Sequence, residues 1–324
     1  MAGIAARAVI LKPGDLLEVP WLPLLAEAGL NTLMLHAARV PEEIDALIIW
    51  AASDAGRAVR KECACHGIRL ETEMHTASWL VPRTEFHARP HLFRQDLRGE
   101  RTPDANWCFS SEEAWALAER RLRALAAALP SDTGRYLWFP DDTAEGLCHC
   151  ERCAPLSAAD QALLYARRLA EVLGALRPGA EVSYLAYLGT MGEVPAAPVP
   201  EGVLLEYAPI RRCYRHALDD LSCAVNRAHL QALGALLPAF AGRPLHATEY
   251  WLDASRHSGW RRPAQRLPVS EDVMRRDIAT YARLGFTSIA SYAVMCDRDY
   301  WQAFGPPPVA AYGRALAEAP AATG

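Results

Sequence analysis

The chain has 324 residues, of which 51% are hydrophobic and 22% are charged, and its formal net charge is -4. This composition is that of a globular protein with enough apolar material for a large core. The arginines are scattered rather than clustered, and no run of about 18 apolar residues is present, so we expect neither nucleic acid nor a membrane among the partners.

Short apolar runs alternate with longer amphipathic segments along the chain. Eight runs have the length and the β-branched or aromatic content of buried strands: residues 8–11, 31–36, 68–75, 135–140, 181–188, 202–208, 244–251 and 287–294. Helix starts are predicted where Ser110 precedes Glu113, where Ser157 precedes Asp160, and at Ser270. Residues 189–201 are rich in Pro and Gly and too few for a normal helix, so the fifth crossover is expected to be degenerate.

Eight strands that alternate with helices predict an α/β fold, namely a single (β/α)8 TIM barrel that occupies residues 1–324. No tract has the composition of a linker. A doubly wound open sheet is the structural alternative, although no Gly-rich GxGxxG turn follows an early strand.

The carboxyl ends of the strands meet at one mouth of such a barrel, where α/β enzymes hold their reactive groups. Carboxylates and aromatic rings are frequent at these ends. Aromatic faces stack on sugar rings and carboxylates bind hydroxyl groups, so we expect a carbohydrate substrate. The residues predicted to bind it are His75, Tyr184, Tyr187, Glu206, Tyr250, Trp251 and Tyr292.

Glycosidases use one carboxyl group that protonates the leaving oxygen and a second that acts as nucleophile or base. Asp141 and Asp142 end the fourth predicted strand, and Glu249 lies near the end of the seventh. We predict that Asp142 is the general acid, that Glu249 is the nucleophile or base, and that Asp141 belongs to the same catalytic group.

A carboxylate after the fourth strand and a glutamate at the end of the seventh resemble the arrangement in the large clan of retaining glycosidases. Asp141 and Asp142 also resemble the Asp-Glu pair of family 20 hexosaminidases, in which the first residue orients the substrate acetamido group and the second is the acid. Here the second position is Asp142 rather than Glu.

The segments WFPDD, CHCERC, SAADQ, YARRLAE, YLAYLG and EYAPIRRCYRHALDDLSCAVN resemble the family known as domain of unknown function 4838. The resemblance spans roughly residues 68–292. It implies a TIM barrel similar to those of glycoside hydrolases, often found within larger carbohydrate-active proteins.

Three cysteines, Cys148, Cys150 and Cys153, lie within one short loop and could share a tetrahedral Zn²⁺. The fourth ligand is sought after the sixth strand, at Cys213 foremost, or at His216 or Cys223. The polar residues between the three cysteines favour a metal over a patch of reduced thiols. The zinc could be structural or catalytic. The remaining cysteines, Cys63, Cys65, Cys108 and Cys296, are expected to be structural.

A glycoside hydrolase is the leading functional hypothesis. The alternatives are a zinc-dependent hydrolase, in which a metal activates water or a sugar hydroxyl, and a sugar-binding barrel without catalysis. The N-terminal segment does not resemble a secretory signal, and nine cysteines are better interpreted as reduced thiols and metal ligands than as disulfides, so we expect a cytoplasmic protein. The sequence gives no indication of the oligomeric state.

Overall fold

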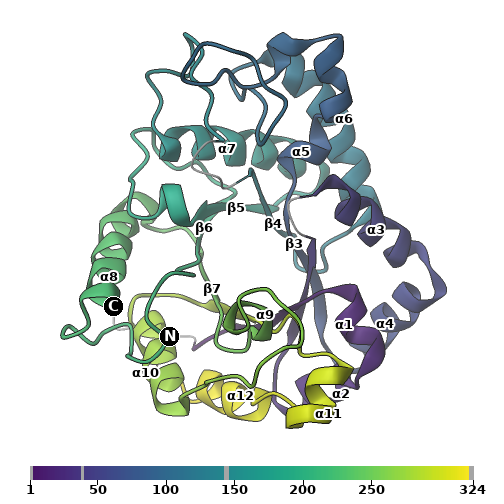
Figure 1. Ribbon diagram of the computed structural model, residues 1–324, viewed down its shortest axis with the longest axis vertical. Coiled ribbons are helices and arrows are strands. Elements are labelled where there is room, and N and C mark those ends of the chain that lie inside the picture. Colours follow the sequence, from purple (N-terminus) through teal and green to yellow (C-terminus); the bar gives the residue numbers. More distant parts are fainter. Residues whose placement is uncertain (1–2, 38–39, 142–145, 321–324) are drawn as a thin grey trace.

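The protein is described by a computed structural model that covers residues 3–37, 40–141 and 146–320. Within these residues, eight parallel strands close into a barrel in the order in which they occur in the sequence (Figure 1). They are β1 (Ala6–Leu11), β2 (Thr32–Ala37), β3 (Arg69–His75), β4 (Arg135–Phe139), β5 (Glu181–Ala186), β6 (Val203–Tyr207), β7 (Leu245–Glu249) and β8 (Ser288–Tyr292). Each overlaps a predicted strand, so the (β/α)8 fold class is confirmed.

Helices surround the strands as a ring (Figure 1). The α-helices are α1 (Pro13–Glu18), α2 (Trp21–Glu27), α3 (Pro41–Ala52), α4 (Asp54–Cys65), α5 (Ala77–Leu80), α6 (Glu112–Ala128), α7 (Ala158–Leu176), α8 (Ala224–Leu236), α9 (Ala254–His257), α10 (Glu271–Arg283), α11 (Arg298–Phe304) and α12 (Val309–Ala317). The short 3-10 helices are η1 (Arg83–His87), η2 (Pro90–Leu92), η3 (Leu188–Thr190) and η4 (Leu237–Phe240). None of the helices in the described ranges is both long and apolar enough to cross a membrane.

Two of the three predicted helix caps are confirmed and one is shifted. Ser157 forms a capping box with Asp160 at the start of α7, and Ser270 caps α10. At α6 the cap is Ser111, whose hydroxyl accepts a hydrogen bond from the Ala114 amide at 3.3 Å. The Ser110 hydroxyl accepts a hydrogen bond from the Cys153 thiol instead.

The connections between strands differ in length, and this decides where loops gather. Between β5 and β6 the only helix among the described residues is η3, so this crossover is degenerate, as predicted. The segment after β3, by contrast, runs from 76 to 111 and contains α5, η1 and η2 before α6 begins. It packs against the loop after β4, since the His149 amide donates to the Gln95 carbonyl at 2.8 Å.

The barrel interior is apolar in the middle and polar toward the carboxyl ends of the strands. Its central cluster consists of alanine, branched aliphatic residues, one methionine and one phenylalanine: Ala8, Ile10, Met34, Leu137, Phe139, Leu204 and Ala290. Successive side chains of a strand point to opposite faces. Since Leu204 points inward on β6, Glu206 does so as well, and this places a carboxyl group above the apolar layer.

Candidate active site

A cavity of about 440 Å³ opens at the carboxyl ends of the strands, and we call it the cup. Polar and aromatic side chains from most of the strands line it. They include Lys12, His36, Glu73, His75, Tyr187, Glu206, Thr248, Tyr250, Asp253, Trp260 and Tyr292. Glu73 and Glu206 are 2% and 0% exposed, so they form part of the floor of the cup rather than its rim.

Glu73 is held by two hydrogen bonds on one carboxylate oxygen. β2 and β3 pair His36 with Glu73, and His36 Nδ1 forms a hydrogen bond with Glu73 Oε2. The Tyr292 hydroxyl of β8 donates to the same oxygen at 2.7 Å. Two hydrogen bonds converge on one oxygen, and an ionised carboxylate can accept both. Glu73 is therefore held in one orientation by His36 and Tyr292.

Glu206 lies in a different environment. The Thr248 hydroxyl donates to its Oε1 at 2.7 Å, whereas Oε2 is buried without a hydrogen-bond partner among the described residues. Burial first, and then the negative charge of Glu73, raise the pKa of Glu206 to about 8, against the smaller lowering effect of the Thr248 hydrogen bond. The group is thus protonated at neutral pH, and its O–H is a donor that a bound molecule can engage.

Asp253 is a third carboxyl group in the lining, but its side chain caps a short helix. It is the N-cap of α9, and its Oδ1 accepts from the Ser255 amide at 3.0 Å and from the Ser255 hydroxyl at 2.6 Å. Burial raises its pKa. Glu73 and Glu206 are therefore the stronger candidates for chemistry.

Aromatic rings form part of the wall of the cup. Tyr250 and Tyr292 stack with ring centroids 5.1 Å apart and an interplanar angle of 10°. Trp260 lines the cup from the loop after α9 while remaining 63% exposed, which is unusual for so large an apolar side chain. An exposed indole beside a hollow is well suited to cover the apolar face of a ligand.

The structure brings five of the seven predicted substrate-binding residues to the cup: His75, Tyr187, Glu206, Tyr250 and Tyr292. His75 is fixed by a hydrogen bond from Nδ1 to the Pro140 carbonyl at 3.0 Å. Asp141 instead lines an adjoining cavity of about 310 Å³, which shares Leu185 and Tyr187 with the cup. Asp142 lies outside the described residues.

Glu249 lies outside the barrel wall, contrary to its predicted place at the catalytic mouth. Because Thr248 points into the cup, its neighbour on the strand points toward the helices. There Glu249 is 0% exposed and accepts from Arg212 Nε at 2.9 and 3.1 Å. The hydroxyls of Tyr281 and Tyr214 donate to it at 2.6 and 2.8 Å. This geometry describes a buried ion pair and does not support a nucleophile.

Trp251 and Tyr184 also point away from the cup, which corrects their prediction as substrate-binding residues. Trp251 is 3% exposed, and its Nε1 donates to Asp277 of α10 at 3.1 Å. Tyr184 is 1% exposed and packs on Phe240, with ring centroids 5.2 Å apart. Tyr184 lies within β5 and Trp251 follows β7, and the alternation of side chains turns both toward the surrounding helices.

Several residues of the cup are not among the seven predicted substrate-binding residues, including Lys12, His36, Glu73, Thr248, Asp253 and Trp260. His36 ends the second predicted strand, so the rule that selected the other strand ends could have found it. Asp253 and Trp260 follow β7 in an irregular segment, and only the general expectation that loops after barrel strands carry function pointed to them.

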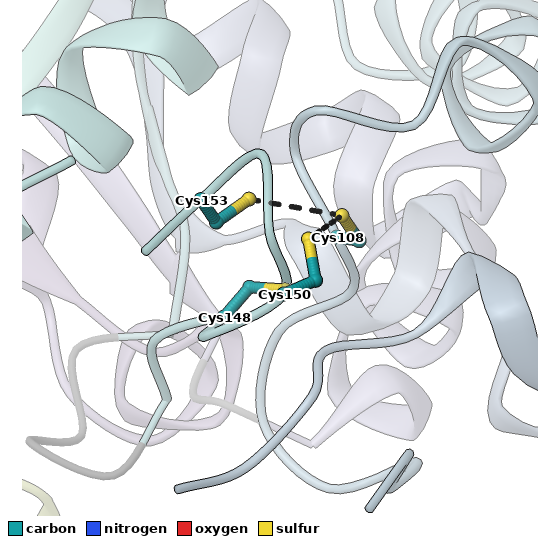
Figure 2. Close-up of side chains that lie close together, drawn as sticks. All are labelled: Cys108, Cys148, Cys150 and Cys153. Carbon is teal, nitrogen blue, oxygen red and sulfur yellow. Dashed lines mark hydrogen bonds between the residues drawn. The ribbon is translucent and has the colours of Figure 1, made fainter. Parts of the chain in front are cut away.

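Figure 2 shows the four cysteines that gather between the loop after β4 and the segment after β3. Cys148, Cys150 and Cys153 are joined by Cys108, all four are buried, and their sulfur atoms lie within 4.8 Å of one another. Cys108 Sγ is 3.7 Å from Cys150 Sγ and 3.8 Å from Cys153 Sγ. Zn–S bonds of about 2.3 Å in a tetrahedron separate sulfur atoms by about 3.8 Å, so the donor set fits zinc.

Cys213, the predicted fourth ligand, does not belong to this cluster, and the fourth thiol is that of Cys108, which was expected to be a structural cysteine. Cys213 belongs to a separate group with His216 and Cys223. Cys108 precedes Cys150 by 42 residues, and the long segment after β3 brings it back to the loop after β4. Spacing along the chain could not indicate this approach.

The chain folds as a (β/α)8 barrel, and glycoside hydrolases of known structure share this fold. A β-galactosidase from Rahnella sp. R3 superposes with a TM-score of 0.56 at 15% identity, over 98% of this chain and 56% of its own. A glycoside hydrolase family 5 enzyme from Prevotella bryantii B14 gives 0.54 at 12% identity, over 97% of this chain and 96% of its own. A GH30 endoxylanase from Clostridium papyrosolvens C71 gives 0.53 at 11% identity, over 98% and 72%.

These similarities establish the fold. The chain spans 57% of the length of another similar structure, the GH42 β-galactosidase Gan42B. A scan against protein-family models and a search of curated proteins both give no match. The predicted resemblances to domain of unknown function 4838 and to family 20 hexosaminidases are therefore not confirmed.

Proposed function

We propose that the chain is a glycoside hydrolase that acts in the cup, with Glu206 as general acid and Glu73 as the second carboxylate. The observation that carries this proposal is the contrast between the two groups. Glu206 is buried with its pKa raised to about 8, whereas Glu73 is hydrogen-bonded to His36 and Tyr292. A pair of carboxyl groups in opposite protonation states is what glycosidic cleavage requires.

The Glu206 hydroxyl would donate its proton to the glycosidic oxygen as the bond to the anomeric carbon breaks. Glu73 would either attack that carbon or take a proton from the attacking water. His36 and Tyr292 would hold Glu73 in place. The predicted pair of Asp142 and Glu249 is not carried forward, because Asp142 lies outside the described residues and Glu249 is engaged by Arg212.

The substrate is proposed to be longer than one sugar unit. The adjoining cavity continues the cup through Leu185 and Tyr187, which line both. Tyr250, Tyr292 and Trp260 offer ring faces to the apolar sides of sugar rings, and the carboxyl groups can bind hydroxyls.

We further propose that the four buried cysteines hold one structural Zn²⁺. Four thiolates complete a tetrahedron and leave no open position for water or substrate, and the described lining of the cup includes none of the four. The ion would tie the segment after β3 to the loop after β4. This arrangement does not favour the alternative of a zinc-dependent hydrolase.

A panel of aryl and natural glycosides, assayed with and without a chelator, tests the proposed reaction. We expect hydrolysis that a brief exposure to the chelator does not abolish. Glu73→Gln should lose activity on every substrate by orders of magnitude, and Glu206→Gln should lose most on substrates with poor leaving groups, which need protonation. Glu201→Gln, at an exposed position just before β6, is the matched control. Sugar binding without turnover would instead favour a non-catalytic sugar-binding barrel.

A further inference from the structure

A second group of soft ligands lies in the loop between β6 and α8, away from the four buried cysteines. Cys213, His216 and Cys223 place their ligand atoms within 4.8 Å of one another. Cys213 Sγ is 3.3 Å from His216 Nδ1. A tetrahedral zinc with Zn–S of about 2.3 Å and Zn–N of about 2.0–2.1 Å separates such atoms by about 3.5 Å, so the two donors already have nearly the required spacing.

A buried amide side chain holds the loop in this shape. Asn226, in the first turn of α8, is 0% exposed. Its Oδ1 accepts from the Cys213 amide at 2.8 Å, and its Nδ2 donates to the carbonyls of Cys213 and His216, each at 2.9 Å. The backbone at both residues is therefore fixed to the helix that begins directly after Cys223.

The rest of the loop is anchored on both sides of these ligands. Arg212, next to Cys213, is held by Glu249. Beyond His216, the Leu218 amide donates to Asp277 Oδ1 at 2.6 Å. The Cys223 amide donates to the Asp220 carbonyl at 3.0 Å. A ligand set that is ordered by such contacts loses little conformational freedom when it binds an ion.

We propose that Cys213, His216 and Cys223 form a second zinc site whose fourth position faces solvent. His216 is exposed, and Cys213 and Cys223 are half-buried. Three protein ligands with an accessible fourth position are typical of exchangeable or reactive zinc, in contrast to a closed site of four thiolates. Water or a small anion completes the coordination. This inference is independent of the proposed glycosidase activity.

Metal content and a spectroscopic probe test the site on the whole 324-residue chain, reduced and free of any polyhistidine tag. With zinc added and excess removed, we expect about two zinc ions per chain, of which a brief treatment with chelator removes about one. The double variant Cys213→Ser/Cys223→Ser should bind about one ion, which resists that treatment. Cys65→Ser, which removes an exposed cysteine outside both groups, should behave like the unaltered protein.

Cobalt supplies the independent readout. Co²⁺ added after chelator treatment should give the thiolate charge-transfer and visible bands of a tetrahedral site, and the double variant should lose them. His216→Ala, an exposed substitution that leaves the fold intact, should weaken Co²⁺ binding by at least about tenfold. Equal metal content and equal Co²⁺ spectra in the unaltered protein and in both variants would overturn the assignment. So would a disulfide between Cys213 and Cys223 in the protein purified without reductant.

Discussion

The raised pKa of Glu206 makes a prediction about stability that does not depend on any substrate. Replacing Glu206 by Gln keeps the size of the side chain and an oxygen that can accept from Thr248, but it removes the ionisable group. In the native protein this carboxyl group must stay protonated until the pH approaches about 8, whereas its ordinary value is 4.5. The pH dependence of stability should therefore change.

The direction follows from the proton balance. Below pH 4.5 the group is protonated in both the folded and the unfolded state, so its contribution is fully present. Between that value and about 8 the unfolded chain releases the proton and the native protein keeps it, so stability falls by about 1.4 kcal/mol for each pH unit. Over the whole window the loss is of order 5 kcal/mol. Glu206→Gln should lack this loss.

Urea unfolding of the unaltered protein and of Glu206→Gln at several pH values between about 5 and 8 measures the effect. The free energy of unfolding of Glu206→Gln minus that of the unaltered protein should increase as the pH rises, by about 3 kcal/mol over two pH units. Glu201→Gln is the control, because the glutamate it replaces is exposed. Parallel pH dependences for the unaltered protein and Glu206→Gln would refute the reasoning that burial holds this carboxyl group protonated.

Three further predictions concern other parts of the molecule. Glu249→Gln should lower the free energy of unfolding by about 3–5 kcal/mol, because it breaks the buried pair with Arg212. The folded fraction of this variant should nevertheless keep its kcat/KM. A fall of kcat/KM by several orders of magnitude in the fully folded variant would restore the catalytic assignment of Glu249. Cys150→Ser should remove the tightly held zinc and lower the thermal midpoint, and an unchanged zinc count would contradict a site of four thiolates. Trp260→Ala should weaken carbohydrate binding by about 1 kcal/mol with little change in the thermal midpoint, because the indole is 63% exposed; unchanged affinity in isothermal titration would exclude it from the binding surface.

The barrel itself could be predicted from the sequence because each parallel strand is buried on both faces and appears as a compact apolar run with a turn signal before it. All eight runs coincide with strands, and the short segment between β5 and β6 lacks a full helix within the described residues. The strand ends also identified several cup residues, among them His75, Glu206 and Tyr292. Local patterns sufficed because secondary structure and the direction of parallel strands together determine which ends meet.

What the sequence could not decide is which of two neighbouring residues faces the cup and which distant segments meet. The side-chain alternation in β7 directs Thr248 inward and Glu249 toward Arg212, and a shift of one residue would have reversed them. Cys108 joins Cys150 only because the segment after β3 folds back over the loop after β4. Register and loop packing depend on contacts across the whole barrel, so only the tertiary structure turns Glu249 away from the cup and places the fourth cysteine in the cluster.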